Sequence, residues 1–151
     1  MEAIIKKIDL KKNAQLLFEM ERAAFTEPYE CPAVKVEEII LYLEDSYVFL
    51  VTDPKGKPLG FFAFQPHPDN SVELRLFAVL PEYQNKGIGK QMLTEFFEIT
   101  KNRAEITART HPRNKVALVL YLKHGFIIYG WVDDFYGDGE PRLLLRKRNK
   151  V

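Results

Sequence analysis

The stretch VELRLFAVLPEYQNKGIGK, residues 72–90, decides the fold of this chain. Apolar and charged residues alternate from Val72 to Leu76, which is the period of a β-strand, and Pro81 ends the strand. From Gly87 to about Arg103, apolar residues recur at the spacing of one helix face. The stretch therefore predicts a strand, a glycine-containing turn and a helix in immediate succession.

The last part of this predicted strand, Val72–Val79, departs from the alternation. Phe77, Ala78 and Val79 form an unbroken apolar run. A change of phase inside a strand is what a β-bulge produces, because one extra residue turns the following side chains to the opposite faces. We therefore expect a bulge at this run, which would leave a backbone N–H group unpaired.

Patterns outside this stretch supply the other elements of the fold. Helical spacing is found over Lys12–Phe25, Val36–Glu44 and Lys115–His124, and strand patterns over Ala3–Leu10, Tyr47–Thr52, Leu59–Gln65, Ala104–Thr110, Ile127–Asp134 and Arg142–Arg148. The central strand–helix–strand unit implies a right-handed parallel crossover, and the hairpins around it imply antiparallel neighbours. We predict an α/β fold, a mixed and mostly antiparallel sheet of about seven strands with about four helices on both faces.

Composition excludes several classes of protein. With 151 residues the chain is expected to form one domain, residues 1–151, and 22 Lys and Arg against 21 Asp and Glu give a net charge of +1. That balance lacks the basic surplus of a nucleic-acid-binding protein, and the basic end Arg146–Lys150 is interpreted as the solvated end of a strand. The single cysteine, Cys31, excludes an intramolecular disulfide and a zinc site built from several thiolates.

Three further absences bear on location and metal content. No apolar stretch approaches the roughly 20 residues that cross a bilayer, and the N-terminal residues do not resemble a signal peptide. The three histidines lack the spacing of metal ligands. We expect a cytoplasmic protein that holds no metal and binds neither nucleic acid nor a membrane.

The turn QNKGIGK, Gln84–Lys90, is suited to an anion. Gly87 and Gly89 let the backbone approach a ligand, and the start of the helix adds unpaired N–H donors and a partial positive charge. Neither the P-loop nor the dinucleotide fingerprint fits, because one residue separates the glycines and Met92 stands where a third small residue is needed. The alternative is a strand-to-helix turn that binds nothing.

Two blocks of sequence resemble the GNAT superfamily of N-acetyltransferases. Gln84–Lys90, after the strand ending in Val79-Leu80-Pro81, is similar to the family's loop for the pyrophosphate of acetyl-CoA. The second block comprises Asn114–Ala117 and Leu120–Phe126, and it is similar to a later motif of the family at the usual separation. The resemblance is close over about Val72–Phe126, and it implies that the two central parallel strands splay apart.

The resemblance implies which residues bind acetyl-CoA, the co-substrate. Those matching the loop are Gln84, Asn85, Lys86, Gly87, Ile88, Gly89 and Lys90. The thioester would lie along Phe77, Ala78 and Val79, with the N–H of Val79 as the donor to its carbonyl. Asn114 would contact the pantetheine arm, although the same side chain is also suited to capping the following helix.

The resemblance also implies catalytic residues. Tyr121 matches the tyrosine that protonates the departing thiolate, and its alternative role is packing on its helix. Glu73 matches the position of a general base, and its alternative is a solvent-facing charge, paired for instance with Arg75. His111 is a second candidate for the base, because imidazoles titrate near neutrality, or else it caps a loop.

The acceptor site is implied less directly. In the family, the first helical pair and the loop between the last two strands border the acceptor pocket. The residues that match these positions, or that lie beside them, are Phe25, Glu27, Tyr29, His111, Tyr136 and Asp138. The alternative for the last two is a hairpin tip anchored by aromatic residues, since Tyr129, Trp131 and Phe135 are close in sequence.

The resulting prediction is an N-acetyltransferase in which a primary amine attacks the thioester directly. The amine belongs to a small molecule, a peptide or a protein, and a homodimer through the last strands is expected from the family. Cys31 lies outside the motif blocks, so an acetyl-cysteine route is not expected. The alternative is a non-catalytic acyl-CoA-binding sensor or interaction module on the same fold.

Overall fold

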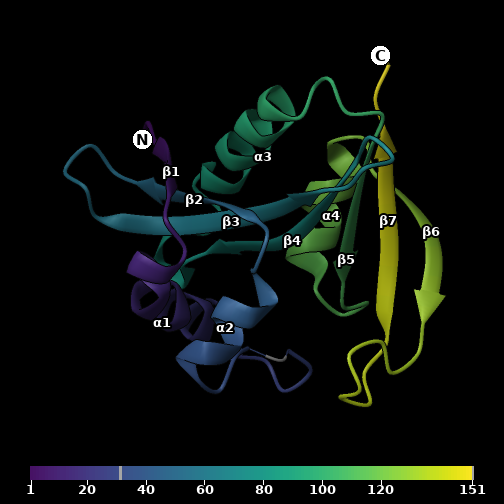
Figure 1. The fold of residues 1–151 in the computed structure, drawn as a ribbon, viewed down its shortest axis with the longest axis horizontal. Coiled ribbons are helices and arrows are strands. Elements are labelled where there is room, and N and C mark those ends of the chain that lie inside the picture. The colour runs from purple at the N-terminus through teal and green to yellow at the C-terminus, as the bar shows by residue number, and fades with distance from the viewer. Residues whose placement is uncertain (31, 151) are drawn as a thin grey trace. The chain divides into compact units, whose positions relative to one another are not determined.

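The computed structural model describes residues 1–30 and 32–150, and its elements follow the predicted order (Figure 1). Cys31 therefore lies outside the described residues. The elements are β1 Ile4–Ile8, α1 Ala14–Ala24, α2 Val36–Tyr42, β2 Tyr47–Thr52, β3 Pro58–Pro66, β4 Ser71–Val79, α3 Ile88–Ile99, β5 Glu105–Thr110, α4 Lys115–Lys123, β6 Ile127–Val132 and β7 Arg142–Arg148. The helix predicted to reach about Arg103 ends earlier, because Thr100 and Arg103 close a turn in which the Arg103 N–H donates to the Thr100 carbonyl.

The strands form a seven-stranded sheet in the order β1-β2-β3-β4-β5-β7-β6. β4 and β5 are parallel, and the pairs β1–β2, β2–β3, β5–β7 and β6–β7 are antiparallel. The predicted fold class is therefore confirmed. None of the helices in the described ranges is both long and apolar enough to span a bilayer.

The chain divides into two compact units, which are described separately. The first comprises Met1–Gln65 and Arg75–Ile99, and the second comprises Pro66–Leu74 and the residues from Thr100 onward. That the whole chain forms one domain stays a prediction.

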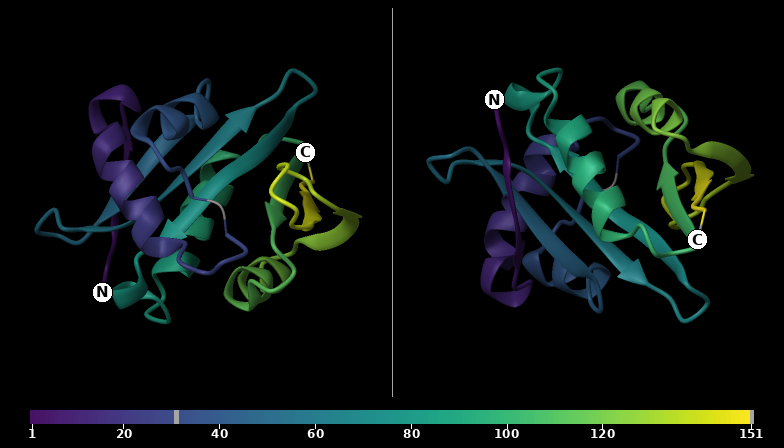
Figure 2. Two further views of the ribbon diagram at one scale, coloured as in Figure 1. Left: turned by 90° about the horizontal axis from the view of Figure 1, so that it is seen from below. Right: turned by 90° about the horizontal axis from the view of Figure 1, so that it is seen from above.

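In the first unit, helices cover both faces of the strands (Figure 2). Phe61 and Ala63 of β3 lie in one cluster with apolar residues of α1 and α2. The intervening Phe62 and Phe64 face α3 instead, with ring centroids 5.9 and 5.3 Å from that of Phe96. Because β3 is covered on both faces, its residues from Leu59 to Phe64 are all buried.

Burial alternates along the whole of β4, so the change of phase expected at Phe77–Val79 stays a prediction, but the contacts of Arg75 and Leu76 depart from those of a regular strand. Leu76 lies in the cluster with α1 and α2. The preceding side chain, Arg75, reaches the same helical layer, with its guanidinium 4.6 Å from the ring centroid of Tyr42. The Tyr42 hydroxyl also donates to the Arg75 carbonyl at 2.9 Å, whereas a regular strand would hold that carbonyl in the plane of the sheet. Two consecutive side chains on one side are what a bulge produces.

Gly60 marks a close approach between β3 and the end of β4. A Cβ atom at this position would lie 2.4 Å from the carbonyl oxygen of Ala78 and 3.3 Å from the Cα of Val79. The backbone itself is in contact here, so only glycine fits without a shift of one strand.

The second unit contains the parallel pair. Its register runs from Ser71 opposite Glu105 to Leu74 opposite Ala108. In β5, Ile106 and Ala108 are buried, while Thr107 and Arg109 alternate with them and are half-buried. Gly125 follows α4 with φ +96°, which confirms the predicted left-handed cap.

Candidate functional site

The turn Gln84–Lys90, which we name the anion turn, lies in the first unit at the start of α3. Asn85 and Gly87 have left-handed backbones, with φ of +60° and +84°. The Gly87 carbonyl accepts the first helical hydrogen bond from Gln91 N–H at 3.1 Å. The N–H groups of Ile88, Gly89 and Lys90 therefore precede the helical hydrogen-bond pattern and are the donors that a helix start offers to an anion.

Side chains hold the anion turn in place. The Gln84 amide donates to the Val79 carbonyl at 3.1 Å, and the Gln84 N–H donates to the Pro81 carbonyl. Gln91 accepts from Ala3 N–H and donates to the Met1 carbonyl, each at 2.8 Å. These contacts of Gln84 stabilise the turn, and its predicted contact with a ligand stays a prediction.

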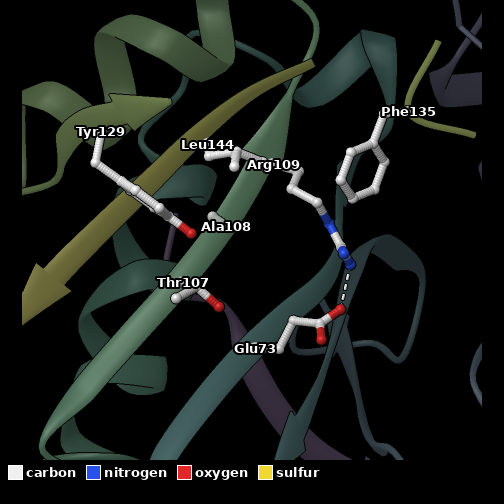
Figure 3. A pocket seen from close by; sticks show the side chains of 7 residues that line it. All are labelled: Glu73, Thr107, Ala108, Arg109, Tyr129, Phe135 and Leu144. Carbon is white, nitrogen blue, oxygen red and sulfur yellow. Dashed lines mark hydrogen bonds and ion pairs between the residues drawn. The ribbon is translucent and has the colours of Figure 1, made fainter. Parts of the chain in front are cut away.

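A pocket of about 210 Å³ lies in the second unit (Figure 3). Its lining residues are Glu73, Thr107, Ala108, Arg109, Tyr129, Phe135 and Leu144. They come from β4, β5, β6, β7 and the loop before β7, and Glu73 lies opposite Thr107 in the parallel register. We name this cavity the Glu73–Arg109 pocket.

Opposite charges meet in the Glu73–Arg109 pocket. The Arg109 guanidinium forms an ion pair with one carboxylate oxygen of Glu73, and His67 Nε2 lies 3.2 Å from the other. The Glu73 and Arg109 side chains are only 16% and 20% exposed. The guanidinium also lies 5.0 Å from the ring centroid of Phe135 and 5.9 Å from that of Tyr136. The pocket therefore holds a carboxylate and a cation side by side with little water around them.

Arg75, the partner considered for Glu73, has contacts with other groups, and its pairing with Glu73 stays a prediction. Arg75 Nη1 donates to Gln65 Oε1 at 2.9 Å, and its guanidinium lies over Tyr42. Arg109 and His67 were not found by sequence reasoning. In the sequence, Arg109 is marked only by its alternation with the buried residues of β5. This alternation does not place Arg109 near Glu73 until the parallel register of β4 and β5 is known.

His111 is buried, and its ring contacts are those of a loop cap. Nδ1 accepts from Arg113 N–H at 3.0 Å, which places the proton on Nε2, 3.0 Å from a carboxylate oxygen of Glu140. A neutral imidazole with both nitrogens bonded in this way has its acceptor nitrogen already occupied. The geometry favours the loop-capping interpretation over a general base.

Tyr121 and Asn114 belong to α4 and its start. Asn114 Oδ1 accepts from Ala117 N–H at 3.2 Å, so its predicted capping role is confirmed. The Tyr121 side chain is 5% exposed, with its ring 5.2 Å from that of Phe126. Burial raises the pKa of the Tyr121 phenol above its ordinary value, and the hydroxyl is therefore protonated at neutral pH. The role of Tyr121 as an acid stays a prediction.

The predicted acceptor residues of the last hairpin have structural partners. Asp138 pairs with Arg142 at 3.1 Å and accepts from Glu140 N–H at 3.0 Å. Tyr136 lies beside two cations, because the guanidinium of Arg142 is 5.1 Å from its ring centroid and that of Arg109 is 5.9 Å away. These contacts favour the interpretation of an anchored hairpin tip over a direct contact with a cationic amine.

The other predicted acceptor residues follow α1 in the first unit. Phe25 packs against the α1–α2 cluster, Glu27 is exposed, and Tyr29 is half-buried. The Glu27 carbonyl accepts from Glu30 N–H at 3.0 Å, which closes a turn. Their contact with an acceptor stays a prediction.

Comparisons with known proteins agree on one family. The model of the acetyltransferase (GNAT) family matches residues 14–126. An uncharacterized N-acetyltransferase of Chlorobaculum tepidum is 32% identical over 119 residues, which cover 76% of this chain and 69% of that relative. A histone acetyltransferase of the MYST family from Arabidopsis thaliana is 28% identical over 76 residues, which cover 50% of this chain but only 17% of that relative.

A solved structure extends the likeness to the whole fold. A GNAT family acetyltransferase from Elizabethkingia anophelis, with acetyl-CoA bound, superimposes with a TM-score of 0.79 at 21% identity. The superposition covers 97% of both chains.

Proposed function

Because this chain belongs to the acetyltransferase (GNAT) family, we propose that it transfers the acetyl group of acetyl-CoA to a primary amine by direct attack in a ternary complex. The observation that carries the proposal is the anion turn, with its left-handed Asn85 and Gly87 before the first N–H groups of α3. A pyrophosphate fits these donors, because they converge where the helix dipole favours negative charge. Lys86 and Lys90 add two cations to the same turn. The structural relative with acetyl-CoA bound supports the choice of co-substrate.

Each chemical step has a residue suited to it. When bound, acetyl-CoA supplies an activated acetyl carbon that the neutral amine attacks. A C–N bond forms, the C–S bond breaks, the nitrogen gives up one proton to the base, and the thiolate takes the phenolic proton of Tyr121. Exchange with solvent then removes the proton from the base and returns one to Tyr121. The raised pKa of Tyr121 keeps that proton in place until the thiolate departs, although it also makes the transfer more uphill.

Glu73 is the base that we propose for the proton of the amine. Its carboxylate is the acceptor group at the Glu73–Arg109 pocket, and His67 against the second oxygen is placed to pass the proton outward. A carboxylate within hydrogen-bond reach of an amine is suited to this role. His111 is less suited, since Arg113 N–H occupies its acceptor nitrogen.

We also propose a homodimer through the last strands. β6 is the terminal strand of the sheet, and its Ile127, Ile128 and Trp131 side chains are 55%, 46% and 55% exposed. An apolar edge strand of this kind is a template for pairing with a second chain. Sedimentation equilibrium is expected to show a dimer that Ile128→Lys converts to a monomer, and a monomeric wild type would overturn the proposal.

The test of acetyl transfer is free-thiol release from acetyl-CoA with a broad panel of amines, amino acids and peptides. Thiol release that depends on the acceptor, with an acetylated amine identified by mass spectrometry, is the expected result. Tight binding of CoA with no turnover on any acceptor would instead favour a non-catalytic sensor.

A further inference from the structure

We propose that the Glu73–Arg109 pocket selects an acceptor that carries a carboxylate beside its amine, that is, a small zwitterionic amino acid. The proposal rests on the proposed acetyl transfer for its chemical step, but the recognition it describes can be measured without that step. Glu73 would bind the ammonium group and later take its proton, and Arg109 would bind the carboxylate.

The geometry presents two opposite charges in direct contact, as one ion pair at the pocket. The Arg109 guanidinium and the Glu73 carboxylate point toward each other across one part of the pocket, with Phe135 on one side and Tyr129 on the other (Figure 3). In an α-amino acid the ammonium and the carboxylate are attached to one carbon atom. Both groups of the ligand can therefore reach their partners at once when the ligand separates the two side chains and takes the place of their ion pair.

Charge balance favours a zwitterion over a simple amine. The Glu73–Arg109 pair is neutral as a whole, and both side chains are largely shielded from water. An ammonium ion alone would add a second cation to a carboxylate that Arg109 already neutralises, in a setting where an uncompensated charge is costly. A zwitterion replaces one internal ion pair by two ion pairs with the ligand and leaves the net charge unchanged.

Arg109 is held in a form suited to carboxylate recognition. The rings of Phe135 and Tyr136, 5.0 and 5.9 Å away, restrict its planar guanidinium. A guanidinium has five N–H donors in a fixed fork that matches the two oxygens of a carboxylate. The aromatic contacts lower the entropy that ordering this side chain would cost.

The remaining walls fit the rest of a small amino acid. Apolar surface is supplied by Leu144, Phe135 and the ring of Tyr129, and Thr107 of β5 adds a hydroxyl group to the lining. The pocket has a volume of about 210 Å³ and is partly open to solvent, so it admits a small molecule. That space suits an amino acid with a modest apolar side chain.

The first experiment varies the acceptor and needs no mutant. Leucine, leucinamide and 3-methylbutylamine share one side chain but differ in having a carboxylate, an amide or neither; analogous trios of smaller and larger apolar amino acids extend the series. We expect kcat/KM for an amino acid to exceed that for its amide and its decarboxylated amine by at least tenfold. Equal or better use of the amides and simple amines throughout would overturn the proposal.

The second experiment assigns the preference to Arg109. Arg109→Gln is expected to reduce the ratio of kcat/KM between amino acid and decarboxylated amine at least tenfold, mainly through KM. Arg109→Lys keeps the charge but loses the fork, so an intermediate ratio is expected. Arg148→Gln is the matched control, because Arg148 lies in the same unit and forms an exposed ion pair with Glu105. An unchanged ratio in folded Arg109→Gln would contradict the assignment.

Direct binding separates this inference from the proposed acetyl transfer. Calorimetry with the amino acid alone, in wild type and in Arg109→Gln, measures recognition without acetyl-CoA. Arg109-dependent binding without any thiol release would support the pocket and contradict the transferase. Thiol release with amines, but with no preference for acceptors that carry a carboxylate, would support the transferase and contradict the proposed recognition at the pocket. Should Arg109→Gln fail to fold, judged by its thermal melt, the substrate trios and Arg109→Lys still decide.

Discussion

The anion turn and the Glu73–Arg109 pocket are built in opposite ways. The anion turn presents backbone N–H groups, and its shape depends on two left-handed residues, Asn85 and Gly87. The pocket presents side chains that come from four strands and a loop. A backbone site is specified by consecutive residues, whereas a side-chain site depends on which strands pair and in which register. This difference explains why the sequence predicts the first site and largely misses the second.

The largest effect on kcat is expected at Tyr121, the buried residue proposed as the general acid. Tyr121→Phe preserves the ring that packs 5.2 Å from Phe126 and deletes the phenolic proton. Loss of a general acid lowers kcat by about a hundredfold or more. We expect that loss in kcat with little change in the Kd of acetyl-CoA, measured by steady-state kinetics and calorimetry.

Tyr47→Phe is the matched control for this substitution, because Tyr47 is an exposed residue of β2. Full turnover of Tyr121→Phe at saturating substrates would make Tyr121 a packing residue. The chemistry would then depend less on side chains than the comparison of the two sites suggests.

How far the sequence reaches can be argued from particular residues. Local patterns predict the element order, the Asn114 cap and the left-handed Gly125, because each depends on neighbours within a few positions. Arg109 was missed because only the parallel register places it near Glu73. Asp138 was assigned to the acceptor because sequence alone does not show that the hairpin turn brings Arg142 onto its carboxylate.

The next largest effect on kcat distinguishes Glu73 from His111, the two candidate bases of the second unit. Glu73→Gln removes a proton acceptor and is expected to lower kcat about a hundredfold. His111→Gln is expected to change kcat only a few-fold and to lower the Tm instead, because the His111 ring caps a loop through Arg113 N–H and contacts Glu140. Steady-state kinetics at saturating substrates should therefore show the large loss of kcat only in Glu73→Gln. The opposite outcome would move the base to His111.

The anion turn is tested by removing its conformational freedom. Gly87→Val places a β-branched residue at φ +84°, a conformation that costs such residues roughly 1–3 kcal/mol and that the turn would abandon. We expect the Kd of acetyl-CoA to rise about ten- to hundredfold in calorimetry.

Gly56→Val is a close control for the anion turn. Gly56 has φ +86°, and like Gly87 it has open space around an added Cβ, but it lies in the turn between β2 and β3. Comparable destabilisation with unchanged acetyl-CoA affinity is expected for this variant. If Gly87→Val also bound acetyl-CoA normally, the anion turn would not be the pyrophosphate site.

The smallest effect concerns Glu21, a buried carboxylate of the first unit that contrasts with Glu73. Glu21 is 7% exposed and accepts from Ala33 N–H at 2.6 Å, next to an Arg22 that donates to the Ala33 carbonyl. Burial raises the pKa of Glu21 above its ordinary value of 4.5, and the Ala33 hydrogen bond offsets this only in part. For an acid with a raised folded-state pKa, the folded state holds the proton more tightly, so this contribution to stability is present at low pH. It is lost as the pH rises from about 4.5 through the raised value.

Glu21→Gln keeps an oxygen for Ala33 N–H and cannot ionise. Its free energy of unfolding is therefore expected to exceed that of the wild type slightly at pH 7, by about 1 kcal/mol or less, and to converge with it below pH 4.5. Urea denaturation at several pH values measures the difference, and Glu19→Gln, on the same helix, is the control for removing an acidic charge. A variant less stable than the wild type at pH 7 would mean that ionised Glu21 is held by more than this backbone contact. In that case the first unit would also contain a carboxylate held by side-chain charges, as Glu73 is in the second.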